Sequence, residues 1–129
     1  MKYLCLICAE TVMEYMDPAE SAAQFDEYQA LIEDLSRSGH YVGCNRLLPR
    51  ETAVTVRVRD GKAITTDGPF VETKEQVGGY FVLEARDIDE ATRIAARIPG
   101  ARYGCVEVRP IADDAATQRL LAAGAAANA

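Results

Sequence analysis

A short apolar run near the N-terminus constrains the fold more than any other stretch of this chain. From Tyr3 to Cys8 the sequence reads Tyr-Leu-Cys-Leu-Ile-Cys, so both alternating faces of a strand built from it are apolar. Such a strand needs cover on both sides, which predicts a central strand of a sheet. The run is too short to cross a bilayer, Glu10 closes it, and no small-residue cleavage site follows. We therefore expect a cytoplasmic protein.

Two amphipathic helices are predicted from their capping residues. Asp17-Pro18-Ala19-Glu20 supplies an N-cap, a proline suited to the first turn and the acid of a capping box, and Gly39 is a stop signal. This predicts a helix over residues 18–38, with an apolar face made of Phe25, Tyr28, Ile32 and Leu35. The second helix begins at Asp87-Ile88-Asp89-Glu90 and ends at Pro99-Gly100, and its buried stripe is Ala91, Ile94, Ala95 and Ile98.

The remaining segments predict strands. Further strands are expected over residues 40–47, 54–59, 62–66, 79–85 and 104–109, the last with Val106 and Val108 facing inward. Over residues 54–59, three valines alternate with Thr55, Arg57 and Arg59, which predicts one buried face and one solvated face. Asp60-Gly61 is the favoured two-residue hairpin turn, because both positions tolerate a positive φ.

The order of these elements predicts an α+β fold, a ferredoxin-like sandwich with an inserted β-hairpin. Two β-α-β units side by side place both helices on one face of an antiparallel sheet. The other face is also apolar, so we expect a homodimer in which two copies pack sheet on sheet. Residues 1–111 form the domain, and the alanine-rich tail, residues 112–129, belongs to it as a short helix packed on the body or on a partner. Beyond Gly124 the tail is expected to fray.

Charge and cysteine placement narrow the possible partners and cofactors. The net charge is −6, and the 14 basic residues form no cluster, which argues against binding to nucleic acid or to an anionic membrane. The pair Cys5 and Cys8 lies inside an apolar strand, where residues three apart face opposite sides. We therefore interpret the cysteines as inert core thiols, and no metal-ligand cluster or dinucleotide fingerprint points to a metal or a cofactor. The four cysteines are Cys5, Cys8, Cys44 and Cys105.

Asp67 is the leading candidate for a catalytic residue. A carboxylate beside the Gly68-Pro69 turn, between two strands, can act as a general base or bind a polar ligand. The structural alternative is that Asp67 closes an Asx-turn with its own backbone while Phe70 plugs the core.

Five further residues are candidates for ligand binding, each with a structural alternative. Lys74, beside Glu75, can bind an anionic substrate or lower the pKa of a base, or both residues can simply be solvated. Tyr15 and Tyr41 can donate hydroxyl hydrogen bonds into a pocket or can belong to the core, and Arg57 can clamp an anion or lie on a wet face. His40, the single histidine, can titrate near neutrality.

The stretch that begins at Asp67 also carries a family resemblance. Asp67-Gly68-Pro69-Phe70, followed by Val-Glu-Thr-Lys-Glu-Gln, resembles the signature of the DGPF (YCII-related) family. Similarity extends over nearly the whole chain to about residue 111, including Val56-Arg57-Val58-Arg59-Asp60-Gly61-Lys62, Ala96-Arg97-Ile98-Pro99 and Gly104-Cys105-Val106-Glu107-Val108-Arg109-Pro110. The resemblance implies a ferredoxin-like fold that dimerises as an α/β barrel.

The resemblance leaves several functions open. Most members have no assigned activity, and some YCII-type relatives are regarded as enzymes with a His–Asp pair between sheet and helix. Their histidine lies within the first helix region, so His40 does not match it. One hypothesis is a cofactor-independent isomerase or lyase that acts on a small polar molecule by acid–base chemistry. The alternatives are a ligand-sensing or protein-binding module, for which gene neighbourhoods of this family suggest sigma-factor or stress regulation, and a purely structural dimer.

Overall fold

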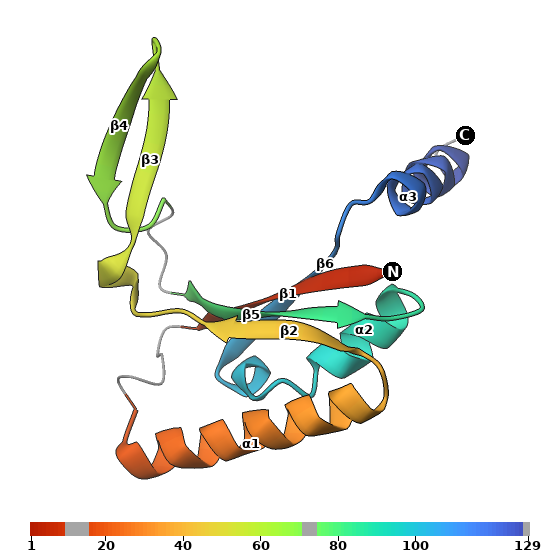
Figure 1. Ribbon diagram of the computed structural model, residues 1–129, viewed down its shortest axis with the longest axis horizontal. Coiled ribbons are helices and arrows are strands. Elements are labelled where there is room, and N and C mark those ends of the chain that lie inside the picture. Colours follow the sequence, from red (N-terminus) through yellow and green to blue (C-terminus); the bar gives the residue numbers. More distant parts are fainter. Residues whose placement is uncertain (10–15, 71–74, 128–129) are drawn as a thin grey trace.

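The computed structural model describes residues 1–9, 16–70 and 75–127 (Figure 1). Six strands, three α-helices and two short 3-10 helices follow one another in the described chain. They are β1 (Lys2–Ala9), α1 (Pro18–Arg37), β2 (Tyr41–Arg46), η2 (Arg50–Thr52), β3 (Val54–Arg59), β4 (Lys62–Asp67), β5 (Gln76–Glu84), α2 (Ile88–Ala95), η3 (Pro99–Arg102), β6 (Gly104–Pro110) and α3 (Asp114–Ala127).

The main sheet has the strand order β2-β5-β1-β6, and every neighbouring pair is antiparallel. Helices α1 and α2 lie on the same side of this sheet (Figure 1). This is the arrangement of a ferredoxin-like sandwich, in which β1 occupies the central position that its apolar sequence predicts. The β3–β4 hairpin forms a separate two-stranded sheet, inserted in the chain between β2 and β5. The predicted α+β fold with an inserted hairpin is therefore confirmed.

The core lies between the sheet and the two helices. Alternate residues of β1 and β5, such as Cys5 and Phe81, point toward the helices and are buried. The principal cluster contains Cys5, Leu31, Leu35, Phe81, Leu83, Ile94, Ala95 and Ile98. The inward-facing Val106 and Val108 of β6 pack against it, as predicted.

Helix α1 begins and ends where its capping residues predict, but its buried face is rotated. Asp17 caps the helix by accepting a hydrogen bond from the backbone N–H of Ala19 at 3.1 Å. The face toward the sheet centres on Leu31 and Leu35, four residues apart, whereas Phe25 is 53% exposed. The expectation that Phe25 belongs to the buried face is wrong, because the helix phase set by the two leucines turns it toward solvent.

The hairpin adopts the predicted turn but does not bury its predicted face. Asp60 and Gly61 both have positive φ, 52° and 73°. The hairpin projects from the body (Figure 1), so among the described residues nothing covers the apolar side of β3. Its three valines, hereafter the valine face, are 59–60% exposed and correct the prediction of a buried face: Val54, Val56 and Val58.

The tail forms a longer helix than expected. Helix α3 continues to Ala127, past the predicted fraying point at Gly124. It extends away from the sheet (Figure 1), and its large apolar residues Leu120 and Leu121 are exposed. In the part of the chain that the structure describes, no helix has the length and apolar character needed to cross a bilayer.

Candidate functional site

Asp67 lies at the exposed end of β4, opposite Val54. Since cross-strand partners share a face, its side chain lies on the valine face, while Arg57 lies on the other side of the hairpin. Arg57 stacks over the ring of Phe70, with its guanidinium carbon 5.1 Å from the ring centre. Phe70 is 71% exposed, so the idea that it plugs the core is wrong. The role of Asp67 as a general base or ligand-binding carboxylate stays a prediction.

Two of the other predicted ligand-binding residues, Tyr41 and Glu75, lie on the main sheet or at its end and not with Asp67 on the hairpin. Tyr41 packs edge-on against Phe81 in the core, and its hydroxyl donates to the Cys44 sulfur at 3.4 Å. This hydrogen bond and burial raise the pKa of Tyr41. Glu75 accepts a hydrogen bond from the Cys105 thiol at the far end of the main sheet. Tyr15 and Lys74 lie outside the described residues.

The structure brings together a different set of polar residues, around His40. Helix α1 ends in a Schellman motif: Gly39 has φ +79°, its N–H donates to the carbonyl of Ser36, and the His40 N–H donates to the carbonyl of Leu35. The backbone carbonyl of His40 then accepts from the N–H of Glu84 at 2.8 Å. The end of α1 is thereby tied to the end of β5, which fixes the imidazole beside the start of α2.

Glu90 comes from the first turn of α2. Asp87 caps this helix by accepting the N–H of Glu90 at 2.9 Å, and the Glu90 carboxylate turns back to accept the N–H of Arg86 at 3.1 Å. This is a variant of the capping box, with the acid reaching one residue before the cap. The Arg86 guanidinium lies 3.0 Å from the second carboxylate oxygen. Glu90 is thus held in one orientation by backbone and side chain together.

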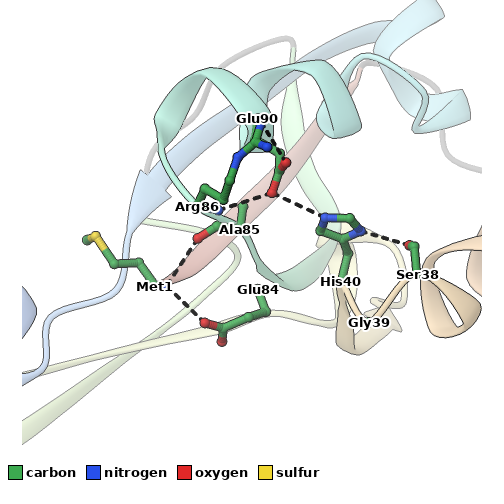
Figure 2. Close-up of a pocket in the computed structure, with 8 residues that line it drawn as sticks. All are labelled: Met1, Ser38, Gly39, His40, Glu84, Ala85, Arg86 and Glu90. Atoms are coloured by element: carbon green, nitrogen blue, oxygen red, sulfur yellow. Dashed lines mark hydrogen bonds and ion pairs between the residues drawn. The ribbon is translucent and has the colours of Figure 1, made fainter.

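His40 connects the two helix ends (Figure 2). Its Nε2 lies 3.2 Å from Glu90 Oε1, and its Nδ1 lies 2.7 Å from the hydroxyl oxygen of Ser38, which is also 3.2 Å from the carbonyl of Leu35. When the imidazole is neutral and Nε2–H faces Glu90, the Ser38 hydroxyl donates to Nδ1. When the imidazole is protonated, Nδ1–H donates to Ser38, whose hydroxyl then donates to Leu35. Both protonation states are therefore fully hydrogen-bonded.

This cluster lines a cavity of about 310 Å³. The histidine side chain is 27% exposed and the Glu90 side chain 16% exposed, so both are shielded but reachable. The amino group of Met1 closes one side, 2.9 Å from a carboxylate oxygen of Glu84 (Figure 2). The lining residues are Met1, Ser38, Gly39, His40, Glu84, Ala85, Arg86 and Glu90.

A second, larger cavity of about 620 Å³ lies at the base of the hairpin. Its walls are mostly apolar, with Leu47, Leu48 and Phe70 among them, and Arg46 and Arg50 contribute charge. The described residues that line it include neither a histidine nor a carboxylate. Among the described residues, no three His, Cys, Asp or Glu side chains converge as metal ligands, here or elsewhere. The His40 cavity is therefore the better candidate for proton-transfer chemistry.

The interaction of His40 with Glu90 was not apparent from the sequence. The two residues are 50 positions apart, one just after the end of α1 and the other in the first turn of α2. The available signal was a matched pair of helix boundaries: a stop at Gly39 immediately before the histidine, and a capping box at Glu90. In a ferredoxin-like fold, the chain leaves the first helix and enters the second at the same end of the sheet. The pair could therefore have been predicted from the topology.

Replacing Glu90 with glutamine is expected to lower the melting temperature at neutral pH. The pKa of Glu90 is lowered, first by the Arg86 backbone N–H and then by the His40 hydrogen bond and the nearby charges, with burial opposing. A lowered folded-state pKa stabilises the protein above the ordinary value of 4.5, and this contribution is lost as pH falls through the lower folded-state value. Melting curves of both proteins should therefore differ at pH 7 and converge in acid. A difference that persists unchanged below pH 4.5 would contradict this account of Glu90.

Comparison with known proteins finds relatives that match most of the chain. A family model described as the YCII-related domain matches residues 1–115. "Uncharacterized protein R00369" of Rhizobium meliloti (strain 1021) is 34% identical over 111 residues, which cover 78% of this chain and 90% of that protein. The family match spans the His40 cavity, the hairpin and the main sheet.

Proposed function

This chain belongs to the YCII-related domain family, and within it we propose a cofactor-independent enzyme that moves a proton on a small polar organic molecule, with His40 as the acid–base group. One observation supports this most: the imidazole stands at the wall of a cavity, between the Ser38 hydroxyl and the Glu90 carboxylate. A histidine oriented by a carboxylate is the common arrangement for proton transfer near neutral pH.

The proposed step passes the proton through the Ser38 hydroxyl. With the imidazole neutral, this hydroxyl donates to Nδ1 of His40, so its oxygen stands at the single lone pair of Nδ1. The Ser38 oxygen accepts the substrate proton while the hydroxyl proton passes to Nδ1, and Glu90 stabilises the resulting imidazolium through Nε2–H. Return of the proton to a different substrate atom completes an isomerisation, and departure of a leaving group completes an elimination.

Arg86 at the cavity can bind an anionic group of the substrate. The Arg86 side chain is 72% exposed and is anchored to Glu90 at only one end, so its remaining N–H donors face solvent. A carboxylate on the substrate can be held there while the reacting carbon lies near His40. Small 2-oxo and 2-hydroxy acids have this combination of an acidic C–H and a carboxylate.

Solvent-deuterium exchange tests this proposal directly. A panel of 2-oxo acids, 2-hydroxy acids and hydroxyketones is incubated with the protein in D₂O. Loss of the signal of the C–H next to a carbonyl group is followed by ¹H NMR. We expect catalysed exchange for at least one compound, and a decrease of about 100-fold or more in His40→Gln, as general acid–base groups contribute. For the Glu90→Gln variant described above, Glu33→Gln is the charge-matched control, because Glu33 is exposed on α1 away from the cavity.

The same assay separates His40 from the hairpin candidate. Exchange that survives in His40→Gln but disappears in Asp67→Asn would move the chemistry to the hairpin. If no compound exchanges but one shifts the resonance of the single histidine saturably, the ligand-sensing alternative is favoured. Circular dichroism of each variant checks that the fold is retained.

We further propose that the protein is a homodimer whose partner covers the valine face. Three valines and the two leucines of α3 lie 44–68% exposed on elements that project from the body. An isolated two-stranded hairpin is only marginally stable in water, and an exposed apolar patch is typical of an interaction surface. The packing of sheet on sheet and the barrel stay predictions. Sedimentation velocity of the purified protein distinguishes monomer from dimer.

A further inference from the structure

The four cysteines are not distributed as core thiols. Only Cys5 is buried, beneath the helices; Cys8 and Cys44 are half-buried and Cys105 is exposed. This corrects the interpretation that all four are inert core residues. The neighbour of Cys8 in the structure is Cys105 and not Cys5. Cys8 of β1 lies directly opposite Cys105 of β6 in the antiparallel register.

The two thiols share one local environment at the end of the sheet. The Cys105 thiol donates to a carboxylate oxygen of Glu75 at 3.5 Å, and Cys8 Sγ lies 4.0 Å from the carbonyl of Leu6. Burial is the first cause that raises the pKa of each thiol. The carboxylates of Glu75 and Glu107 raise both values further, and Cys8 and Cys105 each influence the other. At neutral pH the pair is therefore present mainly as thiols.

Opposite positions in antiparallel strands suit a disulfide. Their Cα atoms lie about 4.5–5.5 Å apart, and disulfides bridge Cα separations of about 4.4–6.8 Å. Both side chains lie on the same face of the sheet, since cross-strand partners always do. The bond can therefore form without moving the backbone, provided the side chains rotate toward each other and Cys105 releases Glu75.

We propose that Cys8 and Cys105 form a dithiol site that low-molecular-weight disulfides oxidise to a cross-strand bond within one chain. The exposed Cys105, as thiolate, attacks the small disulfide, forms a mixed disulfide and expels one small thiol. Cys8, as thiolate, then attacks the Cys105 sulfur and expels the second small thiol. Two electrons pass from the cysteine pair to the small disulfide, and the two protons end on the two released thiols.

This site is independent of the proposed enzymatic function. It uses the opposite end of the chain's sheet from the His40 cavity and none of the residues that line that cavity. The bond would join the edge strand β6 covalently to the central strand β1. We therefore expect the oxidised protein to melt at a higher temperature than the reduced protein, because the link restricts the unfolded chain.

Mass spectrometry of the full chain after incubation with glutathione disulfide tests the proposal. In the wild type we expect a mass decrease equal to two hydrogen atoms and a single peptide pair, containing Cys8 and Cys105, under non-reducing digestion. The reaction should be faster at pH 8.5 than at pH 7, because the raised pKa values limit the thiolate fraction. Cys44→Ser is the control variant that should form the same bond.

Two variants separate the steps. Cys8→Ser should stop at a glutathione adduct on Cys105, and Cys105→Ser should react at least tenfold more slowly, since only half-buried thiols remain at the surface. A wild-type protein that stops at the mixed disulfide, or that cross-links two chains through Cys105, would overturn the proposal. Modification of Cys44 while Cys8 and Cys105 stay reduced would overturn it as well.

Discussion

Replacing Phe81 with alanine is expected to lower the free energy of unfolding by about 3–5 kcal/mol, as large aromatic-to-alanine changes in cores do. Phe81 is 2% exposed and lies on β5, which pairs with both β1 and β2. Its ring contacts Tyr28 at 6.0 Å and Tyr41 at 6.3 Å between centroids, the second edge-on. The substitution removes buried apolar area and both ring contacts at the point where sheet and helices meet.

Chemical denaturation of the two proteins measures this difference. Phe70→Ala is the matched control: the same side chain is removed, but Phe70 is 71% exposed and stacks against Arg57 outside the core. We expect the control to change the free energy of unfolding by less than about 1 kcal/mol. Similar losses for both variants would mean that Phe81 is not the centre of the core.

Replacing Val56 with aspartate is expected to weaken the proposed homodimer by about 100-fold or more, because it places an unpaired charge in the middle of an apolar interface. Val56 is the central residue of the valine face and is 60% exposed in the single chain. The substitution therefore removes no core side chain of the single chain, and we expect the fold of the monomer to be retained.

Thr66→Asp provides the control for this experiment. Thr66 pairs with Thr55 on the opposite side of the hairpin and is exposed, so the same charge is added to the same ribbon on its other face. Sedimentation equilibrium should show a dissociation constant that rises for Val56→Asp and stays near the wild-type value for Thr66→Asp. Equal effects of the two variants would exclude the valine face as the interface, and a monomeric wild type would exclude the dimer itself.

Local sequence patterns predicted most of the fold because each depends on a short stretch of chain. Asp17 and Asp87 cap their helices through backbone groups two or three residues away, and the Asp60-Gly61 turn needs only its own φ angles. The apolar run of β1 likewise predicts a central strand from its own side chains. Strand order then follows from the sequence of elements, since few topologies connect them without crossing.

Side-chain burial was harder to predict where it depends on how elements are placed. The valines of β3 have the alternation of a half-buried strand, but the pattern does not say whether the covering surface belongs to the same chain. The phase of α1 is similar: Phe25 and Gln24 differ by one position, and only docking against the sheet decides that Gln24 is buried and Phe25 exposed.

The sequence by itself therefore determined most of the secondary structure, the ferredoxin-like order of the strands and the N-caps of α1 and α2, because short-range backbone hydrogen bonding and apolar periodicity control them. Only the tertiary structure decided which side chains meet. It joined His40 to Glu90 across 50 residues and placed Cys8 opposite Cys105, the partner that the Cys5-x-x-Cys8 spacing concealed. Contacts of this kind depend on strand register and helix docking, which are set by the packing of the whole core and leave no mark in local spacing.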